Sequence, residues 1–543
     1  MCGFLGGNKF QSTDDVKDGL VSMMHRGYDG NNCVYFEEDE FYMGHNRLSI
    51  QNVGEEANQP FVSHDGRYYL VFNGELWKKS FDLYDDDLRS KYPFKTERSD
   101  TELLLYYLID NFDRLNDALN ELDGMFCFAL YDSQDDTLLM GRDFIGRLPF
   151  YYHYDGQYIA FSSEIKGLQQ SLGFEYYDIQ RGSKWDASYK EKQRIHIVEP
   201  GTYIEYNQFG VLKEYQYFDF KPKPFMISHP TGYYPWSEEE FELYNEEDKG
   251  IDYYSTEFKR LLEKSVENEL ISDVPICTIL SGGIDSTVIT YLLSQKVDNL
   301  EAFVVNVNQK NQDRKKDDLH YARIAAKEFG IKLHEVNVDK SDIEDKLEES
   351  IWASETHKWT QVSPSVAQLF LAEEIRNQGY KVVFGGEGSD EIFASYGDVK
   401  RFCWPNPYHY HQRRVNLLNN LHETNLIRTN KAMMYGGTVE LRTPFLGKDL
   451  IDFGLRIHTN HRDNDMGNGN LMKWVLRKAF EGEISDELLM RPKKTFQVGA
   501  HTDYLKKDKE KLADLHEQLF IKKDVPDKFI NRFHNNIKMK IIG

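Results

Sequence analysis

The chain has 543 residues, of which 40% are hydrophobic, and a formal net charge of −23. This length exceeds what one hydrophobic core usually organises, and the acidic charge argues against a surface that binds the phosphate backbone of nucleic acids, so we expect two domains and no nucleic-acid partner. No apolar run approaches the roughly 20 residues that cross a bilayer, and the N-terminus lacks a signal-peptide pattern, so we expect a soluble cytoplasmic protein without membrane contacts.

The chain opens on "MCGFLGG", which places a cysteine directly after the initiator methionine. Either this end is disordered and the cysteine incidental, or Met1 is removed and the Cys2 thiol lies beside a free α-amine. Such an amine has an unperturbed pKa of about 7.7–8.0, against about 8.5 for a thiol, so it is a suitable base for that thiol. The local sequence leaves both interpretations open.

The first 220 residues or so are dominated by short runs of β-branched and aromatic residues, separated by Gly and Asp. These runs predict strands at 67–76, 124–132, 136–143 and 158–164. Residues 99–112 carry apolar side chains at helical spacing after a Ser-Asp start, which predicts a helix. We therefore expect packed antiparallel sheets with a few helices in this half.

Residues 221–250 are rich in Pro, Gly and acidic residues, which predicts a linker or long loop. This segment separates a first domain at 2–220 from a second domain at 251–543. The second half alternates expected helices with short buried strands: helices at 256–271, 286–295 and 319–330, and strands at 275–280 and 302–307. This alternation predicts a parallel sheet covered by helices.

A glycine-rich turn follows the expected strand that ends at Leu280. Gly282 and Gly283 let backbone amides approach a ligand closely, and the helix that starts near Asp285 adds a positive N-terminus. No GK[ST] sequence follows, so the turn is not a Walker A motif. A plain strand-to-helix connection is the alternative, but the string SGGIDS favours a phosphate site.

This string, continued as "SGGIDST", resembles the pyrophosphate loop of the ATP pyrophosphatases, and "FGGEGSDEIFASY" (384–396) resembles the SGEGSDE loop of glutamine-hydrolysing asparagine synthetases. Further strings match that family in order, including "HRGYDG", "GHNRLSIQ", "VFNGEL", "SDTELL", "GRDFIGRLPFYY", "RTNKAM", "ELRTPFL", "KWVLRKAF" and "RPKKTF". The matches span about residues 2–500. The resemblance implies an Ntn-hydrolase-type αββα sandwich of antiparallel sheets, followed by an α/β domain with a parallel sheet of the ATP-pyrophosphatase type.

For the first domain, the resemblance implies a class II glutamine amidotransferase. Cys2 would attack the glutamine carboxamide, and Asn73 and Gly74 would form the oxyanion hole. Arg47 would pair with the α-carboxylate of glutamine and Asp100, supported by Glu75, with its α-ammonium. The implied glutamine-binding residues are Arg47, Leu48, Asn73, Gly74, Glu75 and Asp100. His25 and Arg26 are interpreted as structural residues that hold a loop over the site.

For the second domain, the resemblance implies ATP binding at Leu280, Ser281, Gly282, Gly283, Asp285, Ser286, Val305, Gly385 and Gly386. Asp285 and Asp390 would hold Mg²⁺, which prefers carboxylate and phosphate oxygens. Glu387 matches an acid linked to acyl-adenylate formation and to attack by ammonia. Lys493 would neutralise the departing pyrophosphate, with Lys494 as a rival. The structural alternatives are helix capping for Glu387 and Asp390 and a solvated surface side chain for Lys493.

Four positions depart from the family pattern. Tyr28 replaces a proline, Thr360 aligns with an arginine, Gly385 replaces a serine, and Gly447 replaces the aspartate of PFLD. We expect Tyr28 to alter loop mobility or glutamine affinity. The departures in the second half leave the acceptor open between aspartate and another carboxylate, on a sugar, peptide, metabolite or modified base.

The leading hypothesis is therefore an ATP-dependent amidotransferase that forms asparagine from aspartate, with ATP and Mg²⁺ as cofactors. One alternative is a carboxylate-activating cyclase of the β-lactam synthetase type, whose members lack the cysteine, and another is a non-catalytic binding protein. The intact strings in both halves argue against these two. A homodimer is implied by the resemblance alone.

Overall fold

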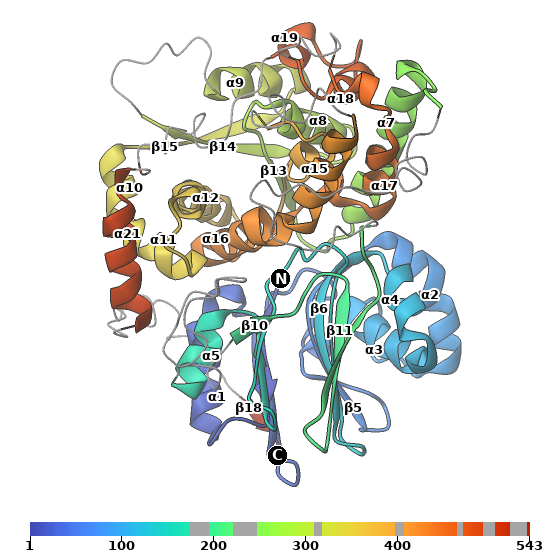
Figure 1. Cartoon of the computed structure of the whole chain (residues 1–543), viewed down its shortest axis with the longest axis vertical. Helices are drawn as coiled ribbons and strands as arrows, with labels where there is room; N and C mark the ends of the chain where they lie inside the picture. The colour runs from blue at the N-terminus through green and yellow to red at the C-terminus, as the bar shows by residue number, and fades with distance from the viewer. Residues whose placement is uncertain are drawn as a thin grey trace.

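The computed structural model describes residues 1–173, 195–220, 247–308, 318–396, 407–463, 471–491, 505, 507–521 and 540–542. The first half contains two sheets, and the strands expected there are present (Figure 1). They are β5 (Tyr68–Leu76), β6 (Gly124–Asp132), β7 (Thr137–Arg142) and β9 (Ile159–Ser162). The predicted helix is α3 (Asp100–Asp110), which begins after Ser99.

The first sheet has seven strands in the order β10-β8-β9-β1-β3-β2-β18. Besides β9, these are β1 (Gly3–Gly7), β2 (Gly30–Phe36), β3 (Phe41–Arg47), β8 (Tyr151–Tyr154), β10 (Ile195–Ile197) and β18 (Lys540–Ile542). Neighbouring strands pair antiparallel, except that β18 pairs parallel with β2. A strand from the far end of the chain thus extends the sheet of the first domain.

The second sheet has six antiparallel strands in the order β12-β11-β7-β6-β5-β4. The strands not yet given are β4 (Phe61–Val62), β11 (Thr202–Asn207) and β12 (Leu212–Gln216). Helices α1 (Thr13–Ser22) and α5 (Ile165–Leu172) cover the first sheet, whereas α2 (Lys78–Lys91), α3 and α4 (Leu115–Glu121) cover the second (Figure 1). Between the sheets, Phe41 stacks on Tyr131 with ring centroids 4.1 Å apart. The predicted αββα sandwich is confirmed.

The second half contains a five-stranded sheet in the order β15-β14-β13-β16-β17, in which every pair is parallel. Its strands are β13 (Ile276–Ile279), β14 (Glu301–Val307), β15 (Lys332–Val338), β16 (Val382–Phe384) and β17 (Glu440–Arg442). The helices are α7 (Ile251–Glu269), α8 (Ile284–Ser294), α9 (Asp318–Phe329), α10 (Lys340–Asp345), α11 (Leu347–Ser354), α12 (Trp359–Asn377), α13 (Ser389–Ile392), α15 (Pro407–Asn419), α16 (Ile427–Gly437), α17 (Lys448–Arg456), α18 (Trp474–Ala479), α19 (Asp486–Leu489) and α21 (Lys509–His516). The predicted α/β domain with a parallel sheet is confirmed.

The order of this sheet places two loops side by side. Strands β13 and β16 are neighbours, and the chain leaves them in opposite directions, β13 toward β14 and β16 toward β17. Ligands of open parallel sheets bind at the carboxyl ends of strands at such a reversal. The loops at 281–286 and 385–390 leave these two carboxyl ends, so the fold brings the two glycine-rich strings together.

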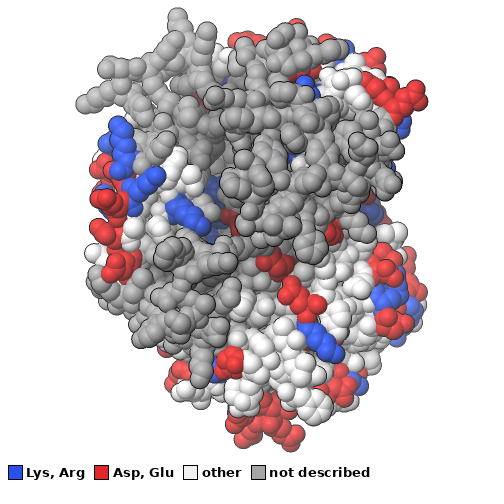
Figure 2. All heavy atoms as spheres, viewed as in Figure 1, with Lys and Arg blue, Asp and Glu red and all other residues white. Residues whose placement is uncertain are grey.

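Charged side chains of both signs lie next to one another on the surface. Over α2, acidic and basic side chains alternate (Figure 2), and Lys78–Asp82 and Arg89–Asp85 form ion pairs one helical turn apart. Such exposed pairs contribute little to stability. Within the part of the chain that the structure describes, no helix has the length and apolar character needed to cross a membrane.

Candidate functional site

Cys2 lies directly before β1 and is held by three neighbours. Its backbone N–H donates to Asn73 Oδ1 at 2.7 Å, and its carbonyl accepts from Arg26 Nε at 2.8 Å. Its thiol accepts from the backbone N–H of Leu48 at 3.4 Å. Burial raises the pKa of the thiol, which is in a residue only 7% exposed. The fold therefore brings together three residues predicted for the first site.

In the side chain of Asn73, the oxygen makes a hydrogen bond, whereas the nitrogen makes none to the described residues. Because Oδ1 accepts from Cys2, the amide group is oriented, and its Nδ2 is buried without a hydrogen-bond partner among the described residues. Buried donors without partners are uncommon in folded proteins. Asn73 and Gly74 lie on β5, next to the edge strand β4, and are fixed by pairing with β6. An amide donor next to a buried thiol is the arrangement that an oxyanion hole requires.

Met1 precedes the thiol and contacts the second domain. Its α-amine donates to Glu440 Oε2 at 3.0 Å, and its sulfur accepts from Asn430 Nδ2 at 2.7 Å. The free α-amine of Cys2 expected from the sequence would form on removal of Met1. The Cys2 nitrogen already points at Asn73 Oδ1, so that contact would orient the new amine.

Arg47 is buried and binds the turn that follows β3. Its guanidinium donates to the carbonyl oxygens of Asn52 and Gly54 at 2.6 Å each and to Asn58 Oδ1 at 3.1 Å. These hydrogen bonds use Nη1 and Nη2, and none of the three uses Nε. The predicted role of Arg47 stays a prediction.

Glu75 and Asp100 lie close together in a buried acidic cluster. Burial raises the pKa of Asp100 to about 7, and it raises the pKa of Glu75 well above its ordinary value, with the nearby charge of Glu440 adding to the effect. The amide nitrogen of Gln51 donates to Glu75 Oε2 and, at 3.5 Å, to Asp100 Oδ2. Sequence reasoning gave Gln51 no role, although it lies within the matched string GHNRLSIQ.

The segment around His25 is fixed between the two domains. His25 Nε2 lies 3.1 Å from both oxygens of Glu164, and burial lowers its pKa. Arg26 donates to Glu164 and also to Asn430 Oδ1 of the second domain. Arg376 of α12 lies over the ring of Tyr28, 5.0 Å from its centroid. The tyrosine that replaces a proline thus makes an interdomain contact.

The loop after β13 closes on itself at the start of α8. Ser286 Oγ accepts from the Ser281 N–H and donates to the Gly283 carbonyl, both at 3.1 Å. Gly282 has φ +71°, and a Cβ there would lie 2.6 Å from the Asp318 carbonyl oxygen, so only glycine fits. Leu280, directly after β13, and Val305, on the neighbouring strand β14, are both buried.

The second loop packs directly on the first. A Cβ at Gly386 would lie 2.9 Å from the Ser286 nitrogen, which shows how closely the two backbones approach. Asp285 and Asp390 meet at the amine of Lys473, whose Nζ is 2.6 Å from both Asp285 oxygens and 2.5 Å from Asp390 Oδ1. Burial opposes the charge of Lys473, but the two carboxylates raise its pKa above the ordinary value.

Beside these loops, the half-buried Glu387 lies near the buried Arg428. Glu387 Oε2 has no partner among the described residues, and burial raises the pKa of this carboxyl while Arg428 lowers it. Arg428, on α16, has Nε and Nη1 without partners in the described part of the chain, and burial lowers its pKa to about 10. Such unmet hydrogen-bonding capacity marks a place for a polar ligand.

Sequence reasoning did not assign Lys473 or Arg428. Both lie in strings that match the family, KWVLRKAF and RTNKAM, and a charged residue inside such a string was the available signal. Lys493 and its rival Lys494 lie outside the described residues. Thr360 is exposed at the start of α12.

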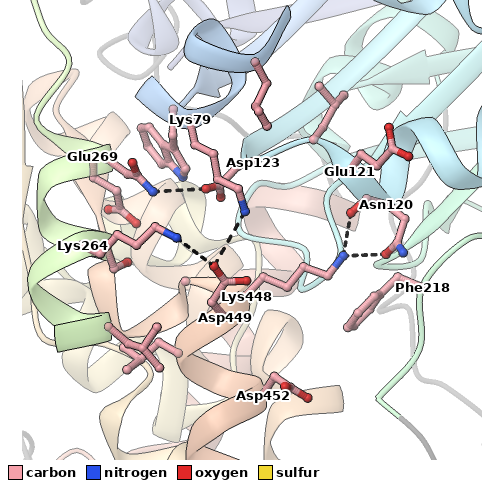
Figure 3. Close-up of a pocket in the computed structure, with 18 of the residues that line it drawn as sticks. Lys79, Asn120, Glu121, Asp123, Phe218, Lys264, Glu269, Lys448, Asp449 and Asp452 are labelled. Atoms are coloured by element: carbon pink, nitrogen blue, oxygen red, sulfur yellow. Dashed lines mark hydrogen bonds and ion pairs between the residues drawn. The ribbon is translucent and has the colours of Figure 1, made fainter. Parts of the chain in front are cut away.

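A pocket of about 600 Å³ lies between the domains, and none of the predicted site residues lines it. Figure 3 shows Lys79 and Lys264 pointing at Asp449 from opposite domains, and Lys448 reaching Asn120. Gly447 also lines this pocket. A Cβ there would lie 2.5 Å from Ser265 Oγ, so a side chain at position 447 would require Ser265 to shift.

Two family profiles match the chain: "Glutamine amidotransferase domain" over residues 1–218 and "Asparagine synthase" over residues 257–533. Asparagine synthetase B [glutamine-hydrolyzing] of Escherichia coli (strain K12) is 30% identical over 508 residues, covering 90% of this chain and 80% of that protein. A probable asparagine synthetase [glutamine-hydrolyzing] of Dictyostelium discoideum is 29% identical, covering 92% of this chain and 85% of that protein.

Among solved structures, glutamine phosphoribosylpyrophosphate amidotransferase from B. subtilis has a TM-score of 0.31 and 17% identity, covering 62% of this chain and 66% of that one. The score is too low to support an argument. The two profiles and the two synthetases cover both halves of the chain, as the ordered strings predicted. The chain therefore belongs to the family of glutamine-hydrolysing asparagine synthetases.

Proposed function

We propose that this protein hydrolyses glutamine at Cys2 and transfers the ammonia to adenylated aspartate, giving asparagine, AMP and pyrophosphate. The observation that carries the proposal is the position of α16 between the two candidate sites. Asn430 of this helix accepts a hydrogen bond from Arg26, which also donates to the Cys2 carbonyl. Arg428 of the same helix lowers the pKa of the Glu387 carboxyl through its positive charge. One helix thus joins the thiol to the expected acyl-adenylate site.

At the first site, the Cys2 thiolate would attack the carboxamide carbon of glutamine. The thiol proton passes to the α-amine freed by removal of Met1, and Asn73 Nδ2 with the Gly74 N–H stabilises the oxyanion. Collapse of the tetrahedral intermediate breaks the carbon–nitrogen bond, and the amine returns the proton to the leaving ammonia. Water then hydrolyses the thioester to glutamate and restores the thiol.

At the second site, the acceptor carboxylate would attack the α-phosphorus of ATP and displace pyrophosphate. The amides of residues 281–286 and the N-terminus of α8 suit the binding of this pyrophosphate. Ammonia then attacks the acyl carbon, and AMP leaves. Glu387 would accept a proton from the attacking ammonia, because burial raises the pKa of its carboxyl and so makes it a stronger base.

The two aspartates of the second site fit a magnesium ion bound together with nucleotide. Asp285 and Asp390 approach the same point, now taken by the Lys473 amine, and carboxylate oxygens are ligands that Mg²⁺ prefers. In the described ranges, no group of three or more His, Cys, Asp or Glu residues is arranged to hold a metal ion by itself, and phosphate oxygens of the nucleotide would complete the coordination. When bound, the ion would neutralise phosphate charge.

Ammonia would move between the domains past the place that Met1 takes in this structure. Met1 is buried between Cys2 and two residues of the second domain, Asn430 and Glu440. Removing it would vacate buried volume between the Cys2 backbone and these two residues. The homodimer and the cytoplasmic location implied by the family stay predictions.

Glutamine hydrolysis should weaken as the pH falls below about 7. Asp100 has a pKa of about 7 and must be ionised to hold the α-ammonium of glutamine, so protonation removes the attraction. We expect protonation of Asp100 to lower kcat/KM for glutamine by about tenfold per pH unit below this value, in addition to any loss from protonation of the Cys2 α-amine. The variant Asp100→Asn should lose about 10- to 100-fold in kcat/KM near pH 8, as expected for a hydrogen bond to a charged group.

The measurement is the initial rate of glutamate formation across the pH range. In Asp100→Asn the fall of kcat/KM near pH 7 should disappear, while any fall caused by protonation of the Cys2 α-amine should remain. An unchanged profile in this variant would show that another group controls the acid limb.

The first test of the proposed function is pyrophosphate release from ATP, Mg²⁺ and glutamine, with and without aspartate. We expect release only with aspartate, and one asparagine for each pyrophosphate. Glutamine hydrolysis without aspartate-dependent pyrophosphate would keep the amidotransferase chemistry and point to another carboxylate. The relatives bear names of asparagine synthetases and favour neither that alternative nor the cyclase.

A further inference from the structure

The side chain of Gln51 lies between the two carboxyls that would hold the α-ammonium of glutamine. Its Nε2 donates to Glu75 Oε2 and to Asp100 Oδ2, the latter at 3.5 Å. The residue is 7% exposed. Its Oε1 is buried without a partner among the described residues, so this placement leaves an acceptor unsatisfied and destabilises the folded state. Gln51 is thus poorly explained as a stabilising residue.

We propose that Gln51 is an internal plug of the glutamine site, whose amide nitrogen takes the place of the substrate's α-ammonium. Glutamine then binds only when this side chain turns away. The inference rests on the proposed function, because it assigns Glu75 and Asp100 to the α-ammonium. An ammonium makes stronger, charge-assisted hydrogen bonds to carboxylates than a neutral amide does, so the substrate displaces the plug.

The second domain holds the backbone on both sides of the plug. The Asn52 N–H donates to Asp273 Oδ2 at 2.7 Å, and the Asp273 N–H donates to the Ile50 carbonyl at 3.0 Å. Asp273 lies three residues before β13, which leads into the loop at 281–286. The position of Gln51 is therefore tied to the strand that carries the expected nucleotide loop.

Through these contacts, the position of the Gln51 side chain depends on the second domain. A displacement of the Asp273 segment would pull on Ile50 and Asn52 together and so rotate Gln51, which lies between them. Asn52 has φ +47°, a left-handed conformation that the flanking hydrogen bonds maintain. Releasing Asp273 should therefore relax the turn and weaken the plug.

The test is the KM for glutamine in glutamate formation by the full-length protein. In Gln51→Ala we expect the KM to fall by about tenfold, as for a site that is open about a tenth of the time in the wild type, with kcat little changed. Gln51→Val should act in the same way, which guards against misfolding of one variant. Val53→Ala is the matched control, because Val53 is in the same turn and 55% exposed, and its KM should stay at the wild-type value.

Asp273→Ala should lower the KM less than Gln51→Ala, and the double variant should match Gln51→Ala alone. This non-additivity would show that Asp273 acts through Gln51. An unchanged or raised KM in both Gln51 variants would overturn the plug, and a rise would make Gln51 a binding residue instead. Failure of the proposed function would give a different result, because the wild-type protein itself would then not hydrolyse glutamine. That result would overturn the proposed role of Gln51 as well.

Discussion

Replacing Cys2 with alanine should abolish asparagine formation from glutamine and leave formation from ammonia at the wild-type rate. The thiol is the nucleophile expected to attack the carboxamide, and the substitution keeps the Cys2 backbone N–H that holds Asn73 Oδ1. Loss of a catalytic nucleophile lowers turnover by on the order of 10³-fold or more. The measurement is asparagine formed with ATP and aspartate, using glutamine or ammonium as the nitrogen source.

Cys33→Ala provides the matched control for this experiment. Cys33 is buried in β2, and burial raises the pKa of its thiol to about 12, so it does not ionise near neutral pH. This variant should keep synthesis from both nitrogen sources. Glutamine-dependent synthesis that survives in Cys2→Ala would show that another group attacks the carboxamide.

Replacing Asp285 with alanine should abolish synthesis from glutamine and from ammonia alike, while glutamine hydrolysis continues. Asp285 accepts from Lys473 and from Ser389 Oγ at 2.7 Å, so its removal leaves the buried Lys473 amine with Asp390 as its remaining carboxylate contact. It also removes one of two carboxylates expected to hold the metal. Loss of such electrostatic stabilisation lowers turnover by about 10²- to 10³-fold.

The variant Asp285→Asn separates charge from packing, because it keeps the shape of the side chain and removes the negative charge. It should also lose synthesis, measured as pyrophosphate and asparagine with each nitrogen source. Asp298→Ala is the control, since Asp298 is exposed in the turn after α8, the helix that carries Asp285. Synthesis that persists in Asp285→Asn would place the metal and phosphate chemistry elsewhere.

The sequence alone determined the fold class of both halves. The aromatic and β-branched runs at 67–76 and 124–132 form β5 and β6, because the tendency to form a strand follows a residue pattern that is visible locally. The strand–helix alternation after residue 251 became a parallel sheet for the same reason. The ordered strings added the family, and they placed Cys2, Asn73, Asp285 and Asp390 in their expected roles before any contact was known.

The tertiary structure decided which distant side chains meet. Lys473 lies 188 residues from Asp285, and Asn430 lies 404 residues from Arg26, yet each pair is in hydrogen-bond contact. Gln51 contacts both Glu75 and Asp100, and Asp273, 221 residues from Asn52, accepts a hydrogen bond from the turn that carries Gln51. Local propensity carries no information about such pairs, since they form only when sheets and helices from both domains pack against one another.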